Sequence, residues 1–102
     1  MKTKTLFLSI LLVLTLVGCS TAAPARLNVM THDSFAVSEP VIQAFEKENN
    51  VKVNIIMSGD AGSALNQAIL TKSAPIADVF YGLDNTFLSR GFNAEIFDPY
   101  SS

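Results

Sequence analysis

The stretch Ala-Asp-Val-Phe-Tyr-Gly-Leu-Asp-Asn at residues 77–85 decides the fold. It begins with a short run of β-forming residues and ends in a glycine and two polar side chains, which is typical of a buried strand that leads directly into a loop. Residues 27–35 and 51–63 have the same layout, and they end in Asp-Ser-Phe and Gly-Asp-Ala-Gly-Ser. The sequence therefore predicts strands at residues 27–31, 51–57 and from residue 77, each delivering a polar loop.

Helical periodicity separates the three predicted strands. The first helix is expected to start after Ser38 as N-cap and to run to Asn49, with Val41, Ile42 and Phe45 on one face. Asn50 is a suitable residue to end it. The second helix is expected to be stopped by Ser-Ala-Pro at residues 73–75. The residues at helical spacing in it are Leu65, Ala68, Ile69 and Lys72. A third, weaker helical pattern is expected to end at Gly91, and residues 92–102 show no assignable element.

The order β-α-β-α-β predicts an α/β fold with a parallel sheet. In such sheets the ligand lies outside the carboxyl ends of the strands, so Asp33, Asp60 and Asp84 are predicted to share one rim. These carboxylates could bind a metal, perform acid-base chemistry or hold an organic cation. Asp33 and Asp60 could equally serve as helix caps, and capping is compatible with binding because a helix N-terminus also accepts anionic groups.

A hydrolytic site is not expected. His32, Asp33 and Ser34 are adjacent, so successive side chains point to opposite sides and cannot form a catalytic relay. His32 is the only histidine and Cys19 the only cysteine, which leaves no ligand set for zinc. Phe80 and Tyr81 should face opposite sides of their strand, with one in the core and either one available to stack on a flat cationic ligand.

Residues 1–18 have the pattern of a secretory signal peptide: two lysines precede an apolar run that is shorter than the roughly 20 residues of a spanning helix. The Leu-Val-Gly-Cys sequence that ends at Cys19 resembles the lipobox of bacterial lipoproteins, which implies lipidation of Cys19. Residues 19–26 would link the anchor to the folded domain. The mature protein is thus expected to be exported and lipid-anchored to a membrane, facing the periplasm or the cell exterior.

Charge argues against a nucleic-acid partner. Removal of the signal peptide takes away two of the seven basic residues and none of the nine acidic ones, which leaves a formal net charge of −4. Nucleic-acid binding depends on clustered Lys and Arg, and the sequence contains no such cluster.

Residues 27–98 resemble the N-terminal part of bacterial solute-binding proteins of ABC importers, most closely the thiamine-binding members. The resemblance is carried by Thr-His-Asp-Ser-Phe-Ala at residues 31–36, by residues 60–66 with their Asp, Ser and Leu-Asn, and by Gly-Leu-Asp-Asn at residues 82–85. It implies two α/β lobes of the type 2 periplasmic-binding-protein fold that close on a ligand by a hinge. Residues 27–102 would then form an incomplete first lobe.

The resemblance also implies the function. The protein would bind thiamine or its phosphate esters, without catalysis or a cofactor, and deliver the ligand to an ABC permease. First-lobe contacts carried over by position are Asp60 and Ala61, with lesser candidates at the rim: Asp33, Ser34, Ser63 and Asp84. The thiamine-binding pattern has Asp-Gly where this chain has Asp60-Ala61. Alternatives are another ligand, such as a ferric ion, an oxyanion or a polyamine, and a truncated chain without binding function.

Overall fold

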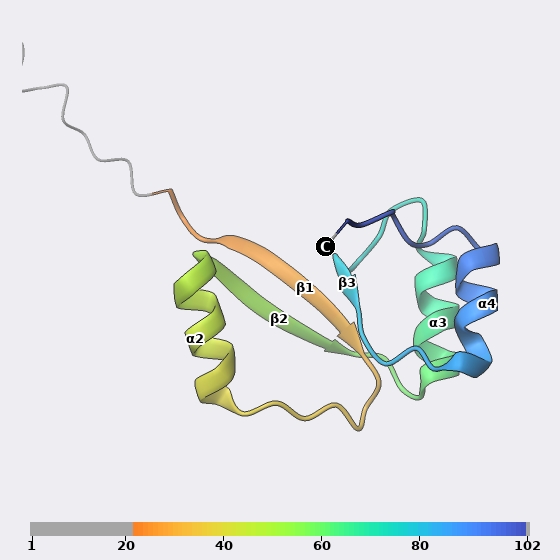
Figure 1. Ribbon diagram of the computed structural model, residues 1–102, viewed down its shortest axis with the longest axis horizontal. Coiled ribbons are helices and arrows are strands. Elements are labelled where there is room, and N and C mark those ends of the chain that lie inside the picture. Colours follow the sequence, from red (N-terminus) through yellow and green to blue (C-terminus); the bar gives the residue numbers. More distant parts are fainter. Residues whose placement is uncertain (1–21, 102) are drawn as a thin grey trace, which may run out of the picture.

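A computed structural model describes residues 22–101 of the chain. The expected signal peptide and Cys19 lie outside these described residues. Six elements follow one another along the chain (Figure 1): β1 (Ala25–Thr31), α2 (Glu39–Asn49), β2 (Val51–Met57), α3 (Ala61–Leu70), β3 (Val79–Phe80) and α4 (Asn85–Asn93). The expected β-α-β-α-β order is confirmed, and β1 begins two residues earlier than predicted.

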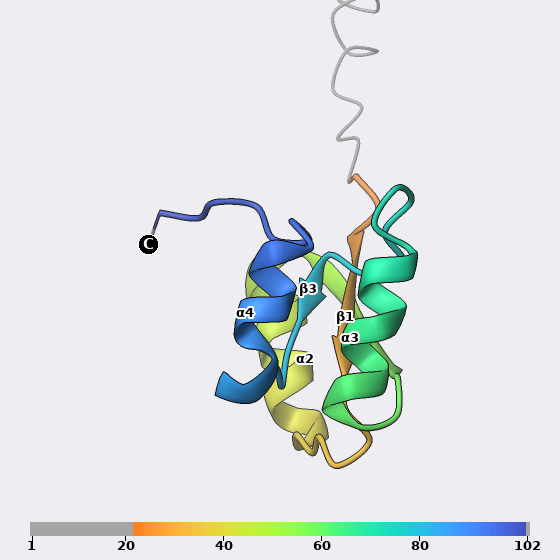
Figure 2. The same cartoon turned by 90° about the vertical axis from the view of Figure 1, so that its right-hand side faces the viewer.

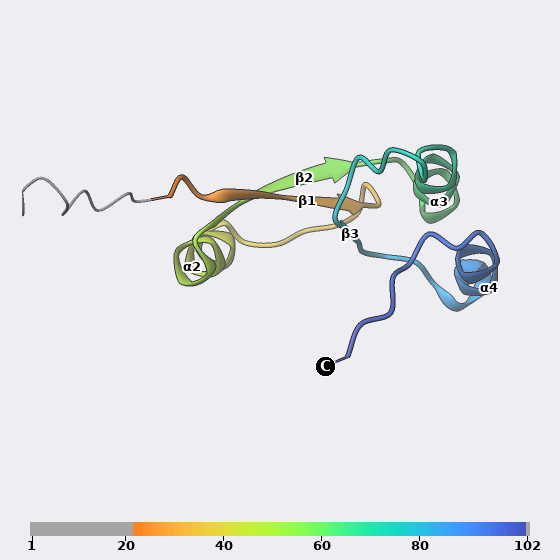
Figure 3. The same ribbon diagram turned by 90° about the horizontal axis from the view of Figure 1, so that it is seen from above.

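The three strands form a parallel sheet in the order β2-β1-β3, which confirms the α/β class. β1 pairs along its whole length with β2, from Ala25 opposite Val51 to Thr31 opposite Met57. β3 pairs with β1 only through Val79 and Phe80. The first crossover leads from β1 to β2, and the second leads back from β2 past β1 to β3, and this arrangement places α2 and α3 on opposite faces of the sheet (Figure 3).

The buried core of the described residues is small and lies where α3 meets the carboxyl end of β1. Met30 is 1% exposed, while Ala64 and Leu65 are fully buried. Thr31, the last residue of β1, is also fully buried. α4 packs beside α3 and away from this core (Figure 2). The sheet end that carries the predicted rim is thus the best-packed part of the domain.

The far end of the sheet is held to α2 by Glu46. Its carboxylate accepts hydrogen bonds from Lys52 Nζ at 2.7 Å and from the backbone N–H of Val53 at 2.8 Å. The Lys52 hydrogen bond, followed by that of Val53, lowers the pKa of Glu46 below its ordinary value. Asn50 ends the helix in the left-handed conformation (φ 51°), as its sequence position suggested. This cap turns the chain directly into β2.

Three details of the sequence prediction are wrong. The third strand is not buried but a two-residue edge strand, with Val79 45% exposed, because β1 covers only one of its edges. The apolar face of α2 is not covered: Val41 and Phe45 are exposed, and α2 has no buried residue. Gly91 does not end α4, which continues to Asn93. This glycine is buried inside the helix, where its lack of a side chain leaves room for neighbouring side chains to pack against α4.

The turn after β3 depends on Gly82. Its φ of +98° lies in a region that side chains rarely adopt, and a Cβ built there would lie 2.2 Å from His32 Cδ2. The imidazole therefore occupies the space that a side chain at position 82 would need. Gly82 in this way fixes both the direction of the chain after β3 and the place of the loop after β1.

Gly82→Ala is expected to lower the free energy of unfolding by about 1–3 kcal/mol, because it adds backbone strain and a steric clash. Gly62→Ala is the matched control: Gly62 is inside α3, and its Cβ would make contacts no closer than 3.4 Å. The control should be neutral or slightly stabilising, since alanine favours helix. Chemical denaturation of both variants measures the difference, and equal stability of the two would contradict this interpretation.

Candidate functional site

The loops after β1 and β2 are joined by a pair of reciprocal hydrogen bonds. The backbone N–H of Asp33 donates to the carbonyl of Gly59 at 2.8 Å, and the N–H of Gly59 donates to Asp33 Oδ1 at 2.9 Å. Just before this pair, Ser58 N donates to the carbonyl of Thr31 at 2.9 Å. The parallel pairing of the two strands is thereby extended into their loops, and the first residues of α3 are fixed next to the end of β1.

Asp60 begins α3 as its N-cap. Its Oδ1 accepts the backbone N–H of Ser63 at 2.7 Å. The pKa of Asp60 is lowered by this backbone hydrogen bond and, next, by one from the Ser63 side chain, while burial acts in the opposite direction. The carboxylate is therefore ionised at neutral pH, and one of its oxygens is committed to the helix.

Asp84 begins α4 in the same way. Its Oδ1 accepts the N–H groups of Thr86 at 2.9 Å and Phe87 at 3.2 Å. The cap sets the position of Phe87, whose ring lies against α3: a Cβ on Gly62 would be 3.4 Å from Phe87 Cζ. The aromatic ring therefore lies within ordinary contact distance of the start of α3.

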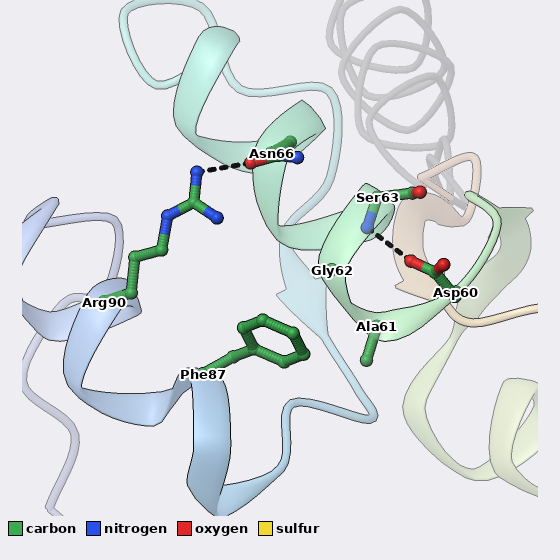
Figure 4. A pocket seen from close by; sticks show the side chains of 7 residues that line it. All are labelled: Asp60, Ala61, Gly62, Ser63, Asn66, Phe87 and Arg90. Carbon is green, nitrogen blue, oxygen red and sulfur yellow. Dashed lines mark hydrogen bonds between the residues drawn. The ribbon is translucent and has the colours of Figure 1, made fainter.

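Residues of α3 and α4 border an open hollow of about 570 Å³. This volume falls within the ordinary range for small-molecule sites. Figure 4 shows the side chains that line it: Asp60, Ala61, Gly62, Ser63, Asn66, Phe87 and Arg90. A hydrogen bond from the Arg90 guanidinium to Asn66 Oδ1 joins the two helices across the hollow.

The predicted site residues divide into two groups. Asp60, Ala61 and Ser63 line the hollow. Asp33, Ser34 and Asp84 do not, although Asp33 and Asp84 hold the elements that form it. Ser34 lies in the exposed loop after β1, where its N–H donates to His32 Nδ1 at 3.2 Å.

Four lining residues were not predicted as site residues: Gly62, Asn66, Phe87 and Arg90. Their spacing carried a signal. Asn66 lies three residues after Ser63, and Arg90 lies three residues after Phe87, so each pair shares one helix face. The spacing within each helix does not reveal that these two faces meet, because the packing of α3 against α4 is a tertiary contact.

An aromatic group flanks the rim on the side of β3. The Tyr81 ring lies 5.1 Å from that of Phe35, edge to face, and 6.3 Å from His32. Tyr81 is 55% exposed, whereas Phe80 is half-buried, which agrees with the expected opposite orientation of the two rings. Tyr81 remains available as a flat surface, but it does not line the hollow.

Two further observations bear on the kind of site. Within residues 22–101, no three or more His, Cys, Asp or Glu side chains are grouped so that they could hold a metal ion. The helices of this same part of the chain are all too short or too polar to cross a membrane.

Asp60→Asn is expected to lower the thermal midpoint at neutral pH and to have no effect at strongly acidic pH. Because the folded-state pKa of Asp60 is depressed, its charge stabilises the fold above the unfolded-state pKa, and this contribution disappears as the pH falls through the folded-state value. Asparagine keeps a side-chain cap but does not titrate. Thermal melts across pH measure the difference between variant and wild type; a difference that does not change with pH would contradict this role.

Comparisons with known proteins gave one group of relatives. No family model and no solved structure matches the chain. The thiamine-binding periplasmic proteins of Brucella abortus, Brucella suis and Brucella melitensis are each 36% identical to it over 90 residues. The matched region covers 81% of this chain and 27% of each relative, so the chain spans about a quarter of the length of these relatives. The resemblance to thiamine-binding members of the solute-binding proteins is thereby confirmed for the part of the relatives that the chain spans.

Proposed function

We propose that this chain contributes first-lobe residues to an extracytoplasmic solute-binding lipoprotein of an ABC importer, and that its ligand is thiamine or a thiamine phosphate ester. The mechanism is binding without chemical conversion, followed by delivery to the permease. Lipidation of Cys19 would tether the protein to the membrane from which the permease takes up the ligand.

The observation that carries the proposal is the convergence of strand-end loops on one ligand-sized hollow. The Asp33 and Gly59 pair fixes the start of α3, and the Asp84 cap fixes the start of α4. Their facing sides form the hollow at the carboxyl end of a parallel sheet, which is where α/β proteins bind ligands. The relatives that match this chain carry the name of thiamine-binding proteins.

The chemistry of the hollow suits a cationic heteroaromatic ring. Asp60 supplies a negative charge, and it is one of the residues that line the hollow. Phe87 supplies a ring face of the kind that attracts organic cations. Ser63 adds a hydroxyl group for polar substituents. Thiamine combines a cationic ring with an alcohol, and so it could use all three groups.

A thermal-shift panel on the full-length protein tests the proposal. Thiamine and its phosphate esters are expected to raise the melting midpoint, because only a ligand of the native state stabilises it by mass action. Ferric ion, oxyanions and polyamines are not expected to do so. A midpoint raised by one of these, and not by thiamine or its esters, would replace the proposed ligand.

The same panel includes Asp60→Asn with Asp98→Asn as the matched control. Asp98 is exposed and does not line the hollow. Loss of the Asp60 charge is expected to weaken thiamine binding about tenfold, as for other interactions with a charged group, whereas the control should bind like the wild type. Equal affinities of the two variants would show that Asp60 does not contact the ligand.

A further inference from the structure

His32 is the residue at which the loop after β1 meets the turn after β3. It follows β1 directly, and its half-buried imidazole lies against the backbone of Gly82, where a Cβ would clash with Cδ2 and lie 3.0 Å from Nε2. The Tyr81 ring lies beside it, with 6.3 Å between the two ring centroids. This packing holds the imidazole in one place at the rim.

The imidazole also closes the turn that carries Asp33. Its Nδ1 accepts the backbone N–H of Ser34 at 3.2 Å, and the carbonyl of His32 accepts the N–H of Phe35 at 3.1 Å. Asp33 lies within this turn and makes the two hydrogen bonds with Gly59 that position the start of α3. The imidazole is therefore connected to the candidate site through a single residue.

The hydrogen bond from Ser34 requires a neutral imidazole. Nδ1 accepts an N–H only when it carries no proton, so the proton of the neutral ring is on Nε2. In the protonated ring both nitrogens are donors, and the N–H at Nδ1 would then face the N–H of Ser34. Histidine ordinarily changes charge between about pH 5 and 8, and His32 is the only histidine in the sequence. A fall in pH across this range therefore removes the contact.

The groups around the imidazole do not replace the lost contact. The carboxylates of Asp33, Asp60 and Asp84 all accept backbone N–H groups. Tyr81, which follows β3, brings a phenol ring and not a charge. In the part of the chain that the structure describes, none of these carboxylates forms an ion pair with His32. Protonation thus breaks one hydrogen bond of the turn without forming another.

We propose that His32 is a pH-sensitive positioning residue for the candidate site. The neutral imidazole holds the turn at Asp33 in the geometry that binds Gly59, and protonation loosens this turn and, with it, the start of α3. The inference rests on the proposed function and deepens it by adding regulation: the affinity for the ligand is highest at about pH 8 and falls toward about pH 5.

Two substitutions separate the hydrogen bond from the packing of the ring. His32→Asn removes the titrating group and keeps an acceptor, because an asparagine Oδ1 readily accepts the N–H of the residue two positions later. His32→Phe keeps an aromatic ring and removes the acceptor. Calorimetry measures thiamine binding to full-length wild type and to both variants at about pH 5.5 and about pH 8, which bracket the ordinary titration of histidine.

Wild type is expected to bind thiamine about three- to tenfold more weakly at the lower pH, the loss typical of one hydrogen bond. His32→Asn should bind like wild type at the higher pH and keep this affinity at the lower one, whereas His32→Phe should bind at both as weakly as acidified wild type. All three proteins meet the same ligand, so titration of thiamine itself cancels in the comparison. Equal pH dependence of wild type and His32→Asn, or wild-type affinity in His32→Phe, would overturn the inference.

A second measurement needs no ligand. In ¹⁵N-labelled full-length protein, the backbone amide signals of Ser34 and Gly59 should move as the pH falls through the range of histidine titration in wild type, and should stay in place in His32→Asn. Signals that behave alike in both proteins would overturn the inference. Wild type that binds no thiamine at either pH would overturn the proposed function, while the amide signals would still decide the role of His32.

Discussion

The reciprocal hydrogen bonds between Asp33 and Gly59 are the contact on which the site depends. They continue the pairing of β1 and β2 beyond the last strand residues, and they do so with one side chain and three backbone groups. Asp60 follows immediately, so the start of α3 has little freedom relative to the sheet. Loss of this contact would release the start of α3, where residues 60–63 supply four of the seven lining residues, while leaving the strands themselves paired.

The three acidic residues predicted at the strand ends differ in whether they only hold the backbone or also line the hollow. The carboxylates of Asp33 and Asp84 accept hydrogen bonds from backbone N–H groups, and neither residue lines the hollow. Asp60 caps a helix and also borders the hollow, so its charge serves both purposes. Of the two residues that the sequence offered as helix caps, Asp60 does cap α3, whereas Asp33 caps no helix because α2 begins at Ser38 and the Asp33 carboxylate accepts the N–H of Gly59. Ligand contact by Asp60 remains a proposal.

The strands and helices could be predicted because each carries a local signal. Polar loops after apolar runs located β1 and β2, and Asn50 marked the end of α2. Burial could not be predicted as well, because it depends on neighbours: Phe45 has the spacing of a core residue but is exposed, and β3 lies at an edge. Gly91 looked like a helix end, and only its contacts with Leu83 and Phe97 explain why a glycine sits inside α4.

The residues that line the hollow could likewise be predicted only in part. Asp60 was predicted because it follows a strand directly, at the end of the sheet where ligands bind, whereas Ala61 and Ser63 were carried over from the family resemblance. All three line the hollow, and their contact with a ligand stays a prediction. Arg90 and Asn66 were missed as site residues because they lie in the second turns of two helices whose packing no local pattern encodes. Their contribution to the hollow is a property of the tertiary fold.

The most direct test of the account is to map the ligand on the protein. In a titration of ¹⁵N-labelled full-length protein with thiamine monophosphate, the backbone amide signals of residues 58–66 and 84–90 should shift most, and those of α2 should stay in place. Shifts confined to α2 and the first residues of β2, with the rim unchanged, would contradict the claim that the strand-end hollow is the binding site.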